Sequence, residues 1–148
     1  MDVRTVCEDD LGELLPLMRG YCDFYEVAPG DDALLDLAMA LIADPEKEGV
    51  QLIARDADGA AVGFATLFWS WSTLSASRLA VMNDLFVHPD ARGSGAADAL
   101  IAVCAERARE HGAASLDWQT AKDNLRAQAV YVRAGAKRSE WLDYSLDV

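Results

Sequence analysis

One segment constrains the fold more than any other: an apolar run over residues 79–87 that leads through a turn into a helix. The run carries Val81, Leu85, Phe86 and Val87 and stops at a His-Pro pair, which predicts a strand. A glycine-rich turn follows, and residues 94–111 then repeat apolar side chains at helical spacing until a glycine ends the pattern. The sequence therefore predicts a buried strand that is joined directly to a long amphipathic helix.

The turn between this strand and this helix has the composition of an anion-binding site. Gly93 and Gly95 allow successive backbone N–H groups to converge because no Cβ interferes, and a helix N-terminus adds partial positive charge. Ala96 and Ala97 would let a bulky ligand approach the first helical turn, and Arg92 would add charge at the entrance. We expect a cradle for a pyrophosphate; the simpler alternative is a tight connection that binds no ligand.

Three other glycine-rich motifs do not match this turn. A P-loop requires Lys followed by Ser or Thr after its last glycine, whereas two alanines follow Gly95. A dinucleotide fingerprint that starts at Gly93 requires Gly or Ala where Asp98 stands. A hydrolase nucleophile elbow requires G-x-S-x-G, and the glycines on either side of Ser94 have the wrong spacing.

The remaining patterns predict an α+β fold with a mixed sheet flanked by helices, in a single domain over residues 1–148. Acidic residues at 8–10 open one helix, and an aspartate after a Pro-Gly break begins a second. An Asp-Gly turn between two apolar runs is a strong hairpin signal. The expected order is βααβββαβαβ, with strands near 3–6, 50–54, 62–71, 79–87, 114–120 and 140–148, and helices near 8–22, 31–42, 94–111 and 124–134.

The chain is acidic, with a net charge of −12 and a pI near 4.4. This charge argues against nucleic acid and anionic membranes as partners, since both require basic patches. It favours a cationic small molecule, unless it serves only to keep the protein soluble. With no signal-like N-terminus and no apolar run of about 18 residues, we expect a cytoplasmic protein. Three widely spaced cysteines and two histidines give no metal-site pattern, so no metal is expected.

The glycine turn resembles motif A of the GNAT superfamily of N-acetyltransferases, whose core is Q/R-x-x-G-x-G/A after a strand. Arg92, Gly95 and Ala97 match that motif in register. About 30 residues later, the sequence also resembles the family's motif B, N-x-x-A-x-x-x-Y-x-x-x-G-F. Asn124 and Tyr131 hold their places in it, and Ala136 replaces the usual Phe. Two motifs in the correct order are a stronger signal than either alone.

The resemblance implies acetyl-CoA as co-substrate and assigns residues to it. In the family, the main chain of the fourth strand pairs with the pantetheine arm, which here implies Leu85, Phe86 and Val87. The turn and first helical residues, with Ser94 included, would hold the pyrophosphate. The sheet would splay between the fourth and fifth strands, and we expect a β-bulge within residues 84–86.

Two residues of motif B have alternative roles. Asn124 begins a helix, where its ordinary role is capping, and the resemblance adds a contact to the cofactor. Tyr131 is either a core tyrosine or, as the resemblance implies, the group that protonates the departing CoA sulfur.

The base and the acceptor pocket are the least determined parts of the site. Related polyamine acetyltransferases often have Glu where Asn83 stands, and an amide can position a water but cannot act as a base. Asp84 is the adjacent carboxylate, but strand alternation directs it to the opposite face unless a bulge re-aims it; its alternative role is a satisfied polar residue. The resemblance places the first two helices over the acceptor. This makes the aromatic and acidic segment 21–26, with Asp23, Tyr25 and Glu26, and the pair Asp31 and Asp32 candidates for binding an ammonium group; the alternative is a solvated charged face.

These observations lead to one main hypothesis and two alternatives. The main hypothesis is an enzyme that transfers acetyl from acetyl-CoA to a primary amine of a small molecule by direct attack. The alternatives are acetylation of a protein N-terminus or lysine, and a non-catalytic acyl-CoA-binding sensor. By analogy with the family we also expect a homodimer.

Overall fold

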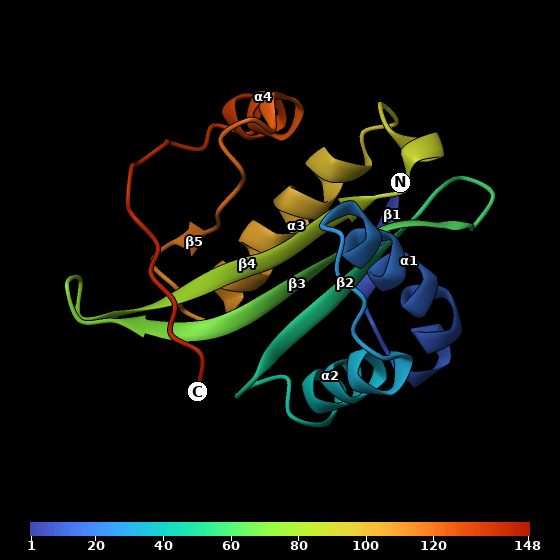
Figure 1. Cartoon of the computed structure of the whole chain (residues 1–148), viewed down its shortest axis with the longest axis horizontal. Coiled ribbons are helices and arrows are strands. Elements are labelled where there is room, and N and C mark those ends of the chain that lie inside the picture. The colour runs from blue at the N-terminus through green and yellow to red at the C-terminus, as the bar shows by residue number, and fades with distance from the viewer.

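The computed structural model describes all 148 residues and contains one five-stranded sheet in the order β1-β2-β3-β4-β5. The first four strands are antiparallel to their neighbours, and β5 runs parallel to β4 (Figure 1). The mixed sheet expected from the sequence is therefore confirmed. The strands are β1 (Asp2–Thr5), β2 (Gly49–Arg55), β3 (Ala61–Ser72), β4 (Ser77–Val87) and β5 (Leu116–Asp117).

Helices cover both faces of this sheet. On one face, α1 (Leu11–Phe24) and α2 (Asp31–Ala43) pack their apolar stripes against the side chains of Ile53, Phe64 and Phe86. On the other face, α3 (Ala96–Glu110) packs against a second apolar cluster. The last helix, α4 (Leu125–Arg133), has no fully buried residue and lies beyond α3 (Figure 1). Short 3₁₀ turns, η1 (Glu8–Asp10) and η2 (Pro89–Ala91), precede α1 and α3. None of these helices is long and apolar enough to cross a membrane.

The sheet opens between β4 and β5, as expected. The two strands pair only at Ala80 and Val81, through Leu116 and Asp117. Beyond Val81, the edge of β4 that faces β5 has no strand partner. The C-terminal half of β4 therefore has one free edge inside the molecule.

A β-bulge interrupts β4 one residue before the expected range. The neighbours Thr66 and Leu67 of β3 pair with residues two apart in β4, so Asn83 between them has no partner of its own. Because one residue is inserted, Met82 and Leu85 both pack toward α3. Asp84 therefore points toward the α1 side of the sheet, which is the opposite face from the one that regular alternation predicts.

Two sequence predictions about the C-terminal part need correction. The strand expected over 114–120 is only two residues long, and the strand expected over 140–148 is absent. After α4 the chain runs extended without joining the sheet (Figure 1), and no backbone hydrogen bond is formed by residues 137–148. Alternation indicates which side chains would share a face of a strand, but it does not show that the segment will pair with a sheet, and the neighbouring edge strand β5 offers only two residues. The helix expected from 94 begins at Ala96.

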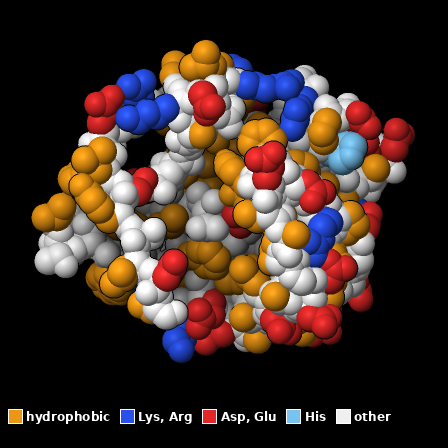
Figure 2. Space-filling model, in the orientation of Figure 1, with side chains coloured by type: hydrophobic (Ala, Val, Ile, Leu, Met, Phe, Trp, Pro, Cys, Tyr) orange, Lys and Arg blue, Asp and Glu red, His pale blue; other side chains and the backbone are white.

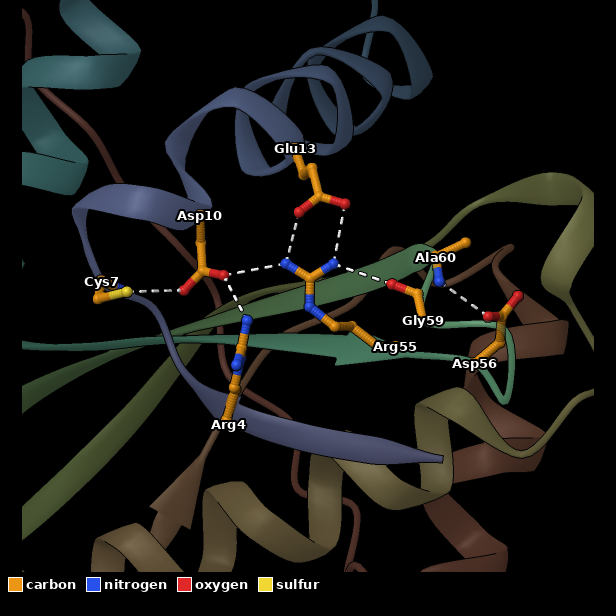
Figure 3. Close-up of polar contacts among 8 residues, drawn as sticks. All are labelled: Arg4, Cys7, Asp10, Glu13, Arg55, Asp56, Gly59 and Ala60. Atoms are coloured by element: carbon orange, nitrogen blue, oxygen red, sulfur yellow. Dashed lines mark hydrogen bonds and ion pairs between the residues drawn. The ribbon is translucent and has the colours of Figure 1, made fainter.

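A buried carboxylate fixes the start of α1 (Figure 3). Asp10 accepts hydrogen bonds from the backbone N–H of Cys7 at 3.0 Å and from the guanidinium groups of Arg4 and Arg55, both at 2.9 Å. Arg55 also donates to both carboxylate oxygens of Glu13, at 2.8 and 2.6 Å. Burial alone would raise the pKa of Asp10, but its hydrogen bonds from Cys7, Arg55 and Arg4 outweigh burial and lower it to about 2.

Candidate active site

A cavity of about 680 Å³ lies where the sheet opens. Figure 2 shows the molecule hollowed between the α4 side and the α1 side, with an apolar interior and basic side chains near α4. Three segments far apart in the sequence form its walls: the end of α1, the end of β4 with the start of α3, and the segment around α4. Of the predicted site residues, the cavity is lined by Tyr25, Leu85, Phe86, Val87, Arg92, Gly93, Gly95, Ala96, Ala97, Asn124 and Tyr131.

The glycine turn has the geometry of an anion cradle. Gly93 and Gly95 have φ values of 83° and 88°, in the left-handed region that favours glycine, and there is open space where their Cβ atoms would stand. The backbone N–H groups of Gly95, Ala96 and Ala97 have no backbone acceptor. These groups lie at the positive end of α3. A phosphate can therefore approach the backbone here without displacing a protein partner.

The charge of the cavity is opposite to that of the protein. Its charged lining residues are Arg92, Arg126 and Arg133 against a single acid, Asp98. Arg133 donates to both oxygens of Asp98, at 3.0 and 2.8 Å, and so links α4 to the first turn of α3. Two arginines remain free of ion pairs at the cradle, which suits a polyphosphate ligand in a chain of net charge −12.

The end of β4 presents its main chain to the cavity. Leu85, Phe86 and Val87 pair with β3 on one side only. The ring of Phe86 packs under α1, where a Cβ on Gly20 would lie 2.8 Å from it, so the glycine lets the helix approach closely. A ligand in the opening could pair with this strand edge as an additional strand would.

Motif B contributes a capping residue and a buried phenol. The Asn124 side chain caps α4 by accepting from the N–H of Ala127 at 3.2 Å, while its amide nitrogen makes no hydrogen bond within the protein. The Tyr131 ring packs edge-on against Trp118, with centroids 5.2 Å apart. Burial, and secondly the charge of ionised Tyr25, raise the pKa of Tyr131. The phenol is therefore protonated at neutral pH and able to donate.

Asp84 lies just behind the cavity wall, next to Tyr21. Its carboxyl accepts from Asn83 Nδ2 at 2.9 Å and lies opposite Thr66 in the strand register, while the Tyr21 hydroxyl donates to the Asn83 carbonyl at 3.5 Å. Burial raises the pKa of Asp84, and these three polar neighbours only partly offset it. A carboxylate whose pKa is raised toward neutrality is a better proton acceptor than an exposed one.

The structure separates the predicted acceptor residues. Tyr25 lines the cavity, whereas Asp23 and Glu26 are exposed near the end of α1 and do not. Ser94, within the glycine turn, is likewise outside the lining.

Several lining residues were not individually predicted. Tyr21 packs edge-on against Tyr25 at 5.1 Å, and its spacing of four residues from Tyr25 would have placed both on one helix face. Phe24, like Tyr21, lies in the predicted acceptor segment 21–26. The others give no comparable signal in the sequence; they are Ala91, Asp98, Thr120, Arg126, Ala129, Val130 and Arg133, with Ala127 known only from the motif.

Comparison with known proteins gives a consistent result. The acetyltransferase (GNAT) family model matches residues 14–136. The N-acetyltransferase YhfO of Bacillus subtilis (strain 168), itself uncharacterised, is 32% identical over 152 residues, which cover 100% of this chain and 98% of that protein. The crystal structure of a probable acetyltransferase is 28% identical with a TM-score of 0.87, over 100% of this chain and 98% of that one.

Solved structures with more specific names differ in substrate. A ribosomal-protein-alanine N-acetyltransferase from Brucella melitensis biovar Abortus 2308 is 26% identical with a TM-score of 0.78, and both chains are covered completely. The aminoglycoside N-acetyltransferase AAC(6')-Iy in complex with CoA is 23% identical with a TM-score of 0.86, over 99% of this chain and 93% of that one, and shows the shared fold. The family match and the full-length relative together establish that this chain belongs to the GNAT family of acyl-CoA-dependent N-acetyltransferases.

Proposed function

We propose that this chain transfers the acetyl group of acetyl-CoA to a primary amine of a small molecule. The observation that carries the proposal is the single cavity that joins the open edge of β4, the anion cradle at α3 and the phenol of Tyr131. CoA has a pyrophosphate for the cradle and a thiol end that would reach Tyr131 along β4. CoA bound to AAC(6')-Iy, a protein of the same fold, supports this assignment.

The reaction requires one proton acceptor and one proton donor. Asp84 takes a proton from the ammonium group of the acceptor, and the freed nitrogen lone pair attacks the carbonyl carbon of the thioester. A backbone N–H of Phe86 or Val87 stabilises the oxyanion. The C–S bond then breaks, Tyr131 protonates the departing sulfur, and the second proton of the attacking nitrogen returns to Tyr131 through water. The proton on Asp84 passes to solvent, so each turnover releases one proton.

The acceptor end of the site favours a small cationic amine. Tyr21, Phe24 and Tyr25 form a cluster of edge-on aromatic rings, with centroids 5.1 Å apart in each neighbouring pair. Ring faces and the negative charge of the protein both attract an ammonium group. By analogy with the family, the proposal includes a homodimer in the cytoplasm.

Acetyl-CoA is expected to stabilise the protein, and NAD and ATP are not. At 100 times its Kd, a ligand that binds only the folded state adds about 2.7 kcal/mol, a shift of several degrees in Tm for a domain of this size. Thermal unfolding with each nucleotide measures this. Thiol release from acetyl-CoA across small amines, aminoglycosides and peptides then identifies the acceptor. Turnover only with a peptide would replace the small-molecule assignment, and stabilisation without any turnover would indicate a sensor.

Tyr131→Phe is expected to lower kcat about 10²-fold with little change in the KM for acetyl-CoA, because it removes a proton donor but keeps the ring against Trp118. Steady-state thiol release at pH 7.5 measures both constants. Tyr144→Phe is the matched control, since Tyr144 is 90% exposed. An unchanged kcat would remove Tyr131 from the mechanism.

A further inference from the structure

A row of polar side chains crosses the sheet beneath α1, where the core is otherwise apolar. Gln51 of β2 pairs in register with Thr66 of β3, and Thr66 pairs with Asp84 of β4. Gln51 is 2% exposed and Thr66 is fully buried. The three side chains therefore lie on one line that ends at the cavity wall, where Tyr21 covers Asp84.

Hydrogen bonds connect this row in one direction. Gln51 Nε2 donates to Thr66 Oγ1 at 3.2 Å. Since that oxygen accepts from Gln51, its own proton is available to the Asp84 carboxyl, which lies opposite Thr66 in the strand register. The Asp84 carboxyl thus has the Thr66 hydroxyl beside it on the sheet and accepts from Asn83 at 2.9 Å.

This row of polar side chains lowers the stability of the fold rather than raising it. Gln51 Oε1 is buried without any hydrogen-bond partner, and its amide has only a long contact of 3.9 Å with the sulfur of Met18 as a second interaction. An unsatisfied buried acceptor costs about 1–3 kcal/mol, and apolar side chains of similar volume would avoid that cost. The bulge at Asn83 adds a break in the strand pairing. The unsatisfied Gln51 oxygen and the bulge are both explained if the function of the row is to hold the Asp84 carboxyl in place.

We propose that Thr66, backed by Gln51, positions the Asp84 carboxylate to accept the proton of the acceptor amine. This inference rests on the proposed function, since it assumes that Asp84 acts as the base. Thr66 and Gln51 are positioning residues that act through Asp84. The titratable group that acts on Asp84 is Tyr21 on α1; Tyr25 on α1 and Tyr131 across the cavity act on Tyr21 in turn, and β2 and β3 contribute none in the row.

Thr66→Val tests this with a change of almost no volume. The hydrogen bond from Thr66 lowers the pKa of Asp84, so its loss raises that pKa. Catalysis needs the ionised carboxylate, so the rising limb of kcat against pH should move to higher pH by about one unit. At a pH on the acidic side of that limb, kcat of the variant should be about tenfold lower than that of the wild type. The KM for acetyl-CoA should stay the same.

Three further variants make the outcome decisive. Thr66→Ser keeps the hydroxyl and should restore the wild-type limb, and Gln51→Met should shift it in the same direction as Thr66→Val but less. Thr5→Val, an exposed threonine on β1, is the matched control and should not shift it. If Thr66→Val does not fold, Gln51→Met and Thr66→Ser still decide the question.

The inference and the proposed function fail in different ways. If wild-type protein shows no acetyl-CoA turnover with any amine, the proposed function is wrong. If turnover occurs and the rising limb disappears in Asp84→Asn, but neither Thr66→Val nor Gln51→Met shifts it, then only the positioning role is wrong.

Discussion

Asp84→Asn is expected to reduce kcat between about 10²- and 10⁴-fold without destabilising the protein at neutral pH. The amide has nearly the shape of the carboxylate and still accepts from Thr66 and Tyr21 through its oxygen, but it cannot take a proton from the amine. Initial rates of thiol release at pH 7.5 measure the loss of kcat, and thermal unfolding at the same pH measures the stability.

The sign of the stability effect follows from the raised pKa of Asp84. In the unfolded chain the group ionises near its ordinary value of 3.8, and in the folded protein it ionises at higher pH. Between these two values the folded state binds more protons, so stability falls as pH rises through that interval. Asp84→Asn removes this loss, and its Tm at pH 7.5 should equal or exceed that of the wild type.

Asp58→Asn is the matched control, because Asp58 is exposed in the β2–β3 turn, away from the cavity. It should leave both kcat and Tm close to their wild-type values. A kcat for Asp84→Asn within a few-fold of wild type would show that the proton acceptor is another group, such as a water held by Asn83. A marked fall in Tm would show that the carboxylate is needed for the fold.

The geometry of the proposed cofactor half of the site could be predicted from the sequence because it depends on local features. A strand, a turn with Gly93 and Gly95, and a helix start are contiguous, so residue type alone determines the backbone conformation and the free N–H groups. Asn124 and Tyr131 lie on one helix at a fixed spacing. For these residues, sequence order and spatial arrangement carry the same information.

The proposed acceptor half depends on contacts between distant segments. The direction of Asp84 is decided by a bulge, and nothing in the local pattern of β4 marks Asn83 as the inserted residue. In the sequence, Thr66 and Gln51 are ordinary strand residues. Only the strand register shows that they lie in line with Asp84. The missing strand over 140–148 has the same origin, since alternation within a segment cannot show whether that segment will pair with a sheet edge.

Asp10→Asn is expected to lower the free energy of unfolding at pH 7 by about 3 kcal/mol, a typical cost when one partner of a buried ion pair is removed. Asp10 is 2% exposed and accepts from Arg4, Arg55 and the Cys7 backbone. Without its charge, Arg55 keeps Glu13 as its only ion-pair partner, and η1 loses the charge-assisted bonds that hold it before α1. Urea unfolding at pH 7 measures the loss.

The acid limb of stability provides the more specific test of the same group. The pKa of Asp10 is about 2 in the folded protein and 3.8 as its ordinary value, so its contribution is complete above pH 4 and is lost as pH falls toward 2. That contribution is about 2 kcal/mol in the wild type, and Asp10→Asn should flatten the stability curve over this interval. Asp9→Asn, at the exposed neighbouring position, should leave the curve unchanged. An equally steep curve in Asp10→Asn would mean that other carboxylates cause acid unfolding, and that the Asp10 network fixes the start of α1 by geometry alone.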